Sequence, residues 1–266
     1  MLVGYAQIKP NFGRKEKNLE RALKLLDASS DLGADLIVLP ELFNTGYAFR
    51  DRKELEKMSE AIPDGLTSRT LMAFAEERGL YICAGISERH RGNFYNSAIL
   101  VGPSGAFGLY RKAHLFADEK RWFEPGNTGF RVFSVQGTAV GIMICFDWFF
   151  PESVRTLALR GAEVICHPAN LVLPYCQTAM LGTAIQNRVF IITANRIGTE
   201  RGLRFTGGSQ IIGPDMRVLA RSGPSEGIKA VDVDPADARD KHITELNDLF
   251  EDRRPGLYSP ICRSND

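Results

Sequence analysis

Apolar runs alternate with stretches of helical periodicity along the first half of the chain. A continuous apolar run predicts a strand buried on both faces, whereas apolar residues at every third or fourth position predict a helix with one buried face. The second pattern predicts a helix over Lys15–Leu32, with Leu19, Leu23 and Leu26 on one face and Gly33 as its end. By the same criteria we expect strands over Leu2–Ile8, Asp35–Leu39, Tyr81–Ser87, Tyr95–Val101 and Phe107–Arg111, and a second helix over Thr67–Arg78.

The second half of the chain repeats this alternation. Ala139–Cys145 is a continuous apolar run, and Pro151 suits the first position of a following helix that Gly161 ends. Another strand is expected over Val164–His167, closed by Pro168. The remaining expected elements are a helix over Met180–Arg188, strands over Phe190–Ala194, Ser209–Ile212 and Ile228–Val233, and a polar, irregular tail after His242.

Two segments about half a chain apart resemble each other. Gly33–Pro40 reads GADLIVLP, and Gly161–Pro168 reads GAEVICHP. The similarity fits either the common succession of helix, glycine and strand in α/β proteins or two halves related by pseudo-symmetry. In the second interpretation each half forms a sheet covered by helices, which gives a four-layer αββα sandwich. We therefore predict an α/β fold of this kind with two pseudo-symmetric halves, and a single domain over residues 1–266 because no low-complexity linker interrupts the chain.

Charge and hydropathy exclude two classes of partner. The 266 residues include 33 Lys and Arg against 32 Asp and Glu, a formal net charge of +1, whereas binding nucleic acid requires a basic surface. The longest apolar stretches, such as Ala139–Phe146, fall far short of the roughly 20 residues of a membrane-spanning helix. The first residues, MLVGYAQIKP, lack the pattern of a signal peptide. We expect a cytoplasmic protein with no nucleic-acid or membrane partner.

Cysteine and histidine usage favours reduced thiols. The five cysteines are odd in number and contain no C-x-x-C pair, and none of the four histidines is spaced as H-x-x-x-H. This pattern is typical of a reducing compartment rather than of a disulfide framework or a zinc site. No metal or cofactor is therefore expected. The cysteines are Cys83, Cys145, Cys166, Cys176 and Cys262.

Cys145 is the first candidate for chemistry, because it ends a predicted strand shortly before the helix that starts at Pro151. A side chain at such a turn lies near free N–H groups and a positive helix end, which lower a thiol pKa and stabilise an oxyanion. The alternative is a buried structural cysteine that behaves as a small apolar side chain.

Charged residues follow other predicted strands. Glu41 comes directly after Asp35–Leu39 and Pro40, where α/β sheets bind ligands, so it is either a partly desolvated general base or an exposed loop carboxylate. Lys112 suits an oxyanion partner or a solvated strand end, and His114 offers a rival Cys–His pair. Glu119 by itself reads as surface charge.

Three segments together resemble the signature motifs of the nitrilase superfamily of carbon–nitrogen hydrolases. They are Leu39–Phe43 (LPELF), Arg111–Phe116 (RKAHLF) and Ile144–Glu152 (ICFDWFFPE), in the order and approximate spacing of that family. Trp122–Gly126 (WFEPG) and His167–Asn170 (HPAN) also match family segments. The resemblance covers essentially the whole chain and implies the αββα sandwich.

The resemblance implies roles for four residues. Cys145 would be the nucleophile and Glu41 the general base that takes its proton. Lys112, together with the backbone N–H of Phe146, would hold the oxyanion, and Glu119 would orient substrate or assist proton transfer. It therefore favours a Cys–Glu–Lys site, whose thiolate attacks an amide or nitrile carbon and forms a thioester that water hydrolyses.

Residues that flank the motifs are the expected pocket walls. Aromatic side chains beside the nucleophile suggest a compact apolar pocket for a small acyl group, although the aromatic run after Cys145 can instead pack the helix start. The absence of an obvious arginine pair disfavours N-carbamoyl amino acids. The expected walls are Tyr47, Phe116, Phe146, Trp148 and Asn170, of which Tyr47, Phe146 and Asn170 are predicted to bind substrate.

The chain looks similar to compact nitrilase-like amidases of prokaryotes, archaeal ones included. We therefore predict hydrolysis of small amides to a carboxylic acid and ammonia. The alternatives are a nitrilase, an N-carbamoyl amidohydrolase and, in a different class, a non-catalytic interaction module, against which the complete set of four candidate catalytic residues argues. The resemblance also implies a homodimer or a larger homo-oligomer.

Overall fold

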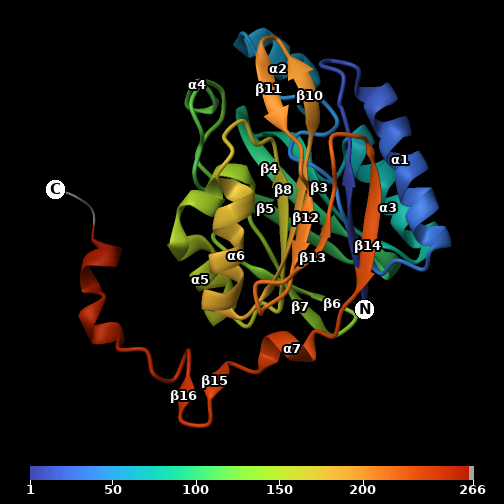
Figure 1. Ribbon diagram of the computed structural model, residues 1–266. Helices are drawn as coiled ribbons and strands as arrows, with labels where there is room; N and C mark the ends of the chain where they lie inside the picture. Colours follow the sequence, from blue (N-terminus) through green and yellow to red (C-terminus); the bar gives the residue numbers. More distant parts are fainter. Residues whose placement is uncertain (264–266) are drawn as a thin grey trace.

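A computed structural model of the chain describes residues 1–263, in which twelve of the strands form two six-stranded sheets packed face to face (Figure 1). The first sheet has the order β14 (Gly227–Asp232), β1 (Leu2–Gln7), β2 (Leu36–Val38), β3 (Tyr81–His90), β4 (Asn93–Val101) and β5 (Phe107–Arg111). The second has the order β13 (Val218–Arg221), β12 (Gln210–Ile212), β9 (Phe190–Asn195), β8 (Val164–Ala169), β7 (Thr138–Ile142) and β6 (Val132–Val135).

Helices cover the outer face of each sheet. α1 (Lys15–Asp31) and α3 (Leu66–Arg78) pack on the first sheet, and α5 (Pro151–Leu159) and α6 (Cys176–Asn187) pack on the second (Figure 1). Both outer layers are built from the apolar face of amphipathic helices. The predicted αββα sandwich is therefore confirmed.

The central strands are apolar on both faces because each face is covered. Val3 and Val38 belong to the core between the two sheets, whereas Ile37 and Leu39 pack beneath the helices with Leu26 of α1. Alternation along a strand sends successive side chains into these two different cores. Continuous apolar runs in the sequence follow directly from this double burial.

The two sheets have the same topology. In the first, β1, β2 and β3 are parallel and joined through α1 and α3; in the second, β7, β8 and β9 are parallel and joined through α5 and α6. Each parallel core has one antiparallel strand on one side and two on the other. The similar segments Gly33–Pro40 and Gly161–Pro168 enter the equivalent strands β2 and β8, so their resemblance reflects two similar halves.

Two local expectations were wrong. β7 ends at Ile142, and Cys145 instead begins a 3₁₀ helix, η2 (Cys145–Phe149), because the chain turns toward α5 three residues earlier than the apolar run suggests. Pro168 lies inside β8 rather than after it. The neighbouring β7 pairs with β8 only as far as Cys166, so the ladder on that side has ended before the proline.

Short elements with mixed polar patterns were missed. They include α2 (Arg52–Met58), α4 (Glu119–Trp122), a two-stranded sheet of β10 (Ile197–Glu200) and β11 (Leu203–Thr206), β6 and β13. After α7 (Ala236–Arg239), the tail forms β15 (His242–Thr244) and β16 (Asn247–Asp248) and extends away from the sandwich (Figure 1). Across residues 1–263, no helix has both the length and the apolar character needed to cross a membrane. Three further 3₁₀ turns are η1 (Pro103–Gly105), η3 (Pro255–Leu257) and η4 (Ser259–Cys262).

Candidate active site

The four residues singled out for chemistry lie together where strands of both sheets end. Glu41 follows β2, Lys112 follows β5, Glu119 begins α4 and Cys145 begins η2. Their exposed fractions are 0 %, 1 %, 4 % and 5 % respectively. Three ionisable groups and a thiol are thus held together with almost no access to bulk water.

Lys112 is the centre of this cluster. Its Nζ donates to Oε1 of Glu41 at 2.7 Å and to Oε1 and Oε2 of Glu119 at 2.7 and 2.8 Å. Asn96 of β4 donates from Nδ2 to Oε1 of Glu41 at 2.6 Å and to Oε2 of Glu119 at 3.4 Å. Within the described residues, Oε2 of Glu41 has no hydrogen-bond partner. This oxygen is therefore free to accept a proton.

Burial and charge set the protonation states. Burial alone lowers the pKa of Lys112, but the charges of Glu119 and Glu41 outweigh it and raise the pKa above its ordinary value, so the ammonium stays protonated. Burial raises the pKa of Glu119 to about 7, and the charge of Glu41 acts in the same direction, while Lys112 and a hydrogen bond from Tyr47 limit the rise. Glu119 therefore titrates near neutral pH.

The thiol of Cys145 is neutral at rest. Burial raises its pKa well above the ordinary value, and Glu41 and Glu119 raise it further, while Lys112 and a hydrogen bond with the backbone of Asn170 oppose the rise. A neutral thiol needs a base to become a nucleophile. The unpartnered Oε2 of Glu41 is the candidate for that base.

The backbone at Cys145 has a left-handed conformation, with a φ of +41°, which costs free energy for a residue other than glycine. The buried carboxylate of Asp147 holds this turn. Its Oδ2 accepts the N–H of Ile144 at 2.9 Å and the hydroxyl of Tyr110 at 2.7 Å, and its Oδ1 lies 3.0 Å from the backbone N and 2.8 Å from Nδ1 of His114. His114, which the sequence offered as an alternative partner for Cys145, thus contacts Asp147 through its backbone N and its Nδ1.

A second contact fixes the carbonyl group of Cys145. Burial lowers the pKa of His167 to about 4, so its ring is neutral. Nε2 lies 3.0 Å from the Cys145 carbonyl oxygen and must donate, because a carbonyl only accepts; Nδ1 then accepts from the Thr193 hydroxyl at 3.0 Å. The N–H of Ile144, just before the strained residue, and the carbonyl of Cys145 itself are therefore both bonded to buried side chains.

Glu41 reaches the cluster because β3 offers no side chain at one position. A Cβ on Gly85 would lie 2.4 Å from Cα of Glu41, and the N–H of Phe43 donates to the Gly85 carbonyl at 3.1 Å. Only glycine permits this close approach.

Two cavities adjoin the cluster. The smaller, about 20 Å³, lies at Cys145, and the larger, about 300 Å³, opens beside Glu119. Phe116 and Val172 line both cavities. The smaller one is otherwise lined by Phe146, Trp148, Phe149, Asn170, Leu171 and Leu173.

The three predicted substrate-binding residues occupy different places. Phe146 and Asn170 line the small cavity at Cys145, and Nδ2 of Asn170 also donates to the backbone carbonyl of Glu41 at 2.9 Å. Tyr47 lines the larger cavity, and its hydroxyl donates to Oε1 of Glu119 at 2.7 Å. Tyr47 is therefore joined to the charged cluster as well as to the cavity wall.

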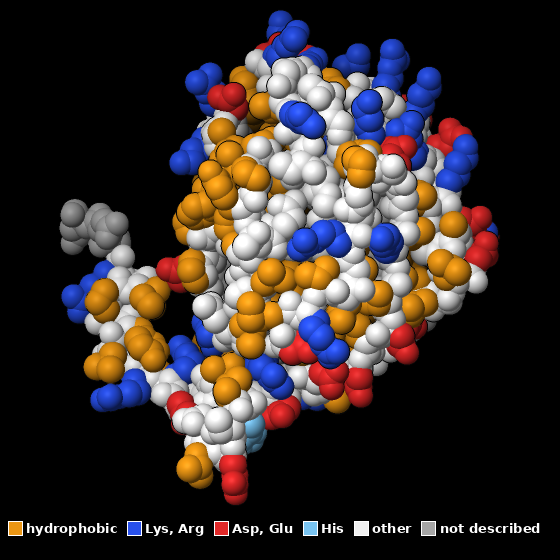
Figure 2. All heavy atoms as spheres, viewed as in Figure 1, with side chains coloured by type: hydrophobic (Ala, Val, Ile, Leu, Met, Phe, Trp, Pro, Cys, Tyr) orange, Lys and Arg blue, Asp and Glu red, His pale blue; other side chains and the backbone are white. Residues whose placement is uncertain are grey.

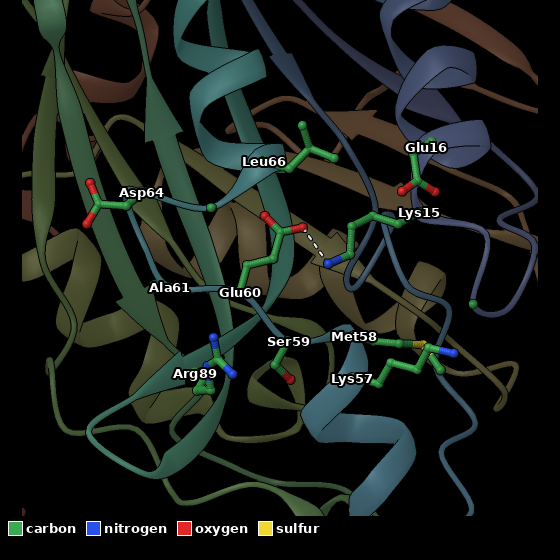
Figure 3. A pocket seen from close by; sticks show the side chains of 12 residues that line it. Lys15, Glu16, Lys57, Met58, Ser59, Glu60, Ala61, Asp64, Leu66 and Arg89 are labelled. Atoms are coloured by element: carbon green, nitrogen blue, oxygen red, sulfur yellow. Dashed lines mark ion pairs between the residues drawn. The ribbon is translucent and has the colours of Figure 1, made fainter.

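Another cavity, of about 560 Å³, surrounds Glu60 away from this cluster (Figure 3). Lys15 pairs with Oε1 of Glu60 at 2.8 Å, and the N–H and hydroxyl of Thr67 at the start of α3 also donate to this carboxylate. The Glu60 carboxylate is thus saturated by structural partners. No predicted site residue lines this cavity.

Comparison with known proteins identifies the family. The family model described as carbon-nitrogen hydrolase matches residues 2–242. This chain belongs to the carbon–nitrogen hydrolase family. It is therefore a hydrolytic enzyme of the nitrilase superfamily, and the alternative of a non-catalytic interaction module is not supported.

Three relatives illustrate the similarity. A protein named nitrilase from Pyrococcus abyssi is 49 % identical over 257 residues, covering 96 % of this chain and 98 % of the relative. The crystal structure of a carbon–nitrogen hydrolase from Helicobacter pylori has a TM-score of 0.90 at 25 % identity, covering 99 % and 98 %. A variant amidase from Nesterenkonia sp. AN1, with acrylamide added at its active site cysteine, has a TM-score of 0.82 at 25 % identity, covering 98 % and 99 %.

Sequence reasoning missed several residues that hold this hydrolase's candidate site. Asn96 and His167 lie inside buried strands, and Asp147 lies in the turn after Cys145; all three are polar and fully or almost fully buried. A polar residue within an otherwise apolar strand is a signal that a buried partner exists. The identity of that partner is not visible in the sequence, because it lies in a distant segment.

We predict that Asp147→Asn disturbs the turn at Cys145. An amide offers one acceptor atom, so in either orientation its NH₂ group faces N–H donors that the carboxylate accepts now. The expected loss of stability is about 1–3 kcal/mol, with slower alkylation of Cys145 by iodoacetamide. Urea unfolding and peptide mass spectrometry measure the two effects. Asp237→Asn, at an exposed carboxylate, is the control; equal alkylation rates in both variants would contradict the role of Asp147.

Proposed function

We propose that this chain hydrolyses small amides through a thioester on Cys145, releasing ammonia and a carboxylic acid. The observation that carries the proposal is the buried cluster in which one lysine bridges two carboxylates beside the thiol. In this proposal Cys145 is the nucleophile, Glu41 the general base, Lys112 the oxyanion partner and Glu119 the group that orients Lys112 and the substrate.

The first half-reaction needs one proton to travel from sulfur to nitrogen. Oε2 of Glu41 takes the proton of Cys145, and the thiolate attacks the amide carbon. The resulting oxyanion is stabilised by the Lys112 ammonium and by the backbone N–H of Phe146. The proton held by Glu41 passes to the leaving nitrogen, the C–N bond breaks, and ammonia departs. A thioester on Cys145 remains.

The second half-reaction uses the same groups. Glu41 takes a proton from water, and the hydroxide attacks the thioester carbon with Lys112 again facing the oxyanion. The C–S bond breaks, sulfur recovers the proton from Glu41, and the carboxylic acid leaves. No step needs a group that the described residues do not supply.

The small cavity at Cys145 supports a short acyl group. Its volume, about 20 Å³ between Phe146, Trp148 and Leu171, is far smaller than the roughly 300 Å³ of the cavity beside Glu119. Asn170 supplies a polar wall, and its Oδ1 is buried without a partner in the described residues. An amide NH₂ group is a suitable donor to that oxygen. We therefore assign Phe146 and Asn170 to substrate binding at Cys145, and Tyr47 to the wall of the larger cavity beside Glu119.

Hydrolysis of nitriles is the second candidate. The relative from Pyrococcus abyssi, at 49 % identity, is named nitrilase. The same thiolate can attack a nitrile carbon, and addition of two water molecules gives the acid and ammonia. Both candidates use the same four residues, so the substrate panel below distinguishes them.

We predict ammonia release from short aliphatic amides such as acetamide, propionamide and butyramide, at rates above those for the matching nitriles. The small cavity at Cys145 causes a fall in kcat/KM as the acyl chain lengthens. Cys145→Ala removes the nucleophile, and Cys262→Ala, at an exposed cysteine, is the control. Equal ammonia release by Cys145→Ala and the unchanged chain would contradict the proposal. Ammonia release from the nitriles alone would show that the substrates are nitriles rather than amides.

The pKa of Glu119 predicts the acid side of the pH profile. Ionised Glu119 shares Lys112 with Glu41; when Glu119 binds a proton below about pH 7, Lys112 is held by Glu41 alone and loses the position that faces the oxyanion. We expect kcat/KM to fall below that pH by roughly tenfold per unit. The glutamine in Glu119→Gln does not titrate, so the kcat/KM profile of this less active variant should lack the acid limb. Glu77→Gln, on the surface of α3, is the control, and an unchanged limb in Glu119→Gln would exclude Glu119 as its origin.

The expected homo-oligomer stays a prediction. Exposed apolar side chains lie on and beside α5 and α6 and along the C-terminal tail, as Figure 2 shows for one face of the molecule. Association would remove these groups from water. They are Phe149, Leu159, Leu173, Tyr175, Ile243, Leu246, Leu257, Tyr258 and Ile261. Light scattering from the purified chain tests this expectation, and a monomer at micromolar concentration would contradict it.

A further inference from the structure

A buried ion pair lies outside the four-residue cluster and has no part in the proposed reaction. Arg196, directly after β9, pairs through Nη1 with Oε2 of Glu200 on β10 at 2.8 Å, and the two side chains are 1 % and 5 % exposed. The guanidinium also lies 4.0 Å from the centroid of the Phe205 ring, and Nη2 donates to the Pro10 carbonyl at 3.2 Å. Burying two charges is costly unless both are well bonded, so this pair is a weak source of stability by itself.

The second oxygen of Glu200 holds a loop that belongs to the candidate site. Oε1 accepts the N–H groups of Tyr47 and Ala48, each at 2.7 Å. Gly46 precedes them with a φ of +86°, and a Cβ at that position would lie 2.7 Å from Oε2 of Glu200. The loop therefore follows the carboxylate closely.

The same two-stranded sheet also fixes the ring of Tyr47. Phe205 of β11 packs edge-on against it, with centroids 6.0 Å apart and planes at 84°. With backbone and ring both held, the hydroxyl of Tyr47 meets Oε1 of Glu119 at 2.7 Å. That oxygen also accepts a hydrogen bond from Nζ of Lys112. A continuous chain of contacts therefore runs from Arg196 to the centre of the candidate site.

The groups around Glu119 define what this hydrogen bond can influence. Charged neighbours are Lys112 after β5 and Glu41 after β2; the titratable Cys145 comes from η2, and the neutral amide of Asn96 comes from β4. The cavity beside Glu119 adds the charged side chains of Arg50, Asp118 and Arg201. The Glu119 carboxylate accepts hydrogen bonds from three of the surrounding side chains, those of Lys112, Asn96 and Tyr47.

We propose that Arg196 and Glu200 are positioning residues that hold Tyr47 in place, so that its hydroxyl keeps Glu119 ionised and Lys112 shared between two carboxylates. The inference rests on the proposed function for its kinetic consequence, although the contacts themselves do not depend on the substrate. A hydrogen bond to a carboxylate favours its charged form, so losing the bond raises the pKa of Glu119. The acid limb of the activity then moves to higher pH.

Glu200→Gln tests the pair with a minimal change. A glutamine has one acceptor oxygen, so it can face either the two N–H groups of the loop or Arg196, and its NH₂ group then opposes the other donors. Tyr47→Phe removes only the hydroxyl that reaches Glu119. Glu163→Gln is the matched control, because Glu163 is also buried, accepts the backbone N–H of Ala139 and pairs with Arg239, but lies before β8 and away from the loop that carries Tyr47.

We expect Tyr47→Phe to move the acid limb of kcat/KM up by about one pH unit, the effect of one lost hydrogen bond to a charged group. Glu200→Gln moves it in the same direction by a smaller amount. The double variant moves it no further than Tyr47→Phe alone, because Glu200 acts through that hydroxyl. Glu163→Gln leaves the limb unchanged. If Glu200→Gln does not fold, Arg196→Lys takes its place, with a shift in the same direction.

A second readout separates this inference from the proposed function. Iodoacetamide alkylates Cys145 whether or not any amide is hydrolysed, and its rate against pH, followed on the Cys145 peptide by mass spectrometry, reports the same charged cluster. Shifts in the alkylation profile without amide hydrolysis would uphold the positioning role and contradict the proposed activity. A folded Glu200→Gln with both profiles unchanged, or shifts that add in the double variant, would overturn the positioning role.

Discussion

The charge of Lys112 is the constraint on which the site depends. An ammonium group with 1 % exposure has lost almost all contact with water and must be compensated by buried anions. Two carboxylates compensate it, and they repel each other unless the lysine lies between them. The three charges therefore stabilise one another as a group, and removing Lys112 would leave two buried carboxylates without a cation.

The packing of the two sheets brings these groups together with Cys145. Glu41 and Lys112 come from strand ends of the first sheet, whereas Cys145 comes from the turn after β7 in the second. Neither half of the chain contains both the charged cluster and the thiol, so face-to-face packing of the two similar sheets assembles the site. The strained backbone at Cys145 is tolerated because Asp147 and His167 fix it from the surrounding structure.

The sequence allowed prediction of those parts of the site that have a local signal. Glu41, Lys112 and Cys145 each follow an apolar run, and their motifs resemble those of a known family, so their convergence was predictable. Asn96, Asp147 and Glu200 hold these groups through contacts with distant segments. No local pattern shows that Glu200 bonds a loop more than 150 residues earlier, because such a contact exists only after the sheets have packed.

The same reasoning explains where the secondary structure was predictable. The elements that build the sandwich, such as β2 and α1, have a strong apolar pattern. Side chains of β2 enter both the core between the sheets and the core beneath the helices, and α1 buries its apolar face against the first sheet. Most residues of β10 and β11 are exposed or partly exposed, and the two strands include the charged Glu200 and Arg204. These strands contact a loop rather than fill a core, so they show no strong apolar pattern. Elements that position a site in this way have weaker patterns than elements that build the sandwich.

Mass spectrometry of the enzyme during turnover tests the central claim most directly. The chain is mixed with a short aliphatic amide, quenched in acid and digested. The account predicts that the peptide containing Cys145 carries the acyl group of the amide, with the other cysteine peptides unchanged. Sustained release of ammonia with the acyl group on a different residue, or with Cys145 removed by substitution, would contradict it.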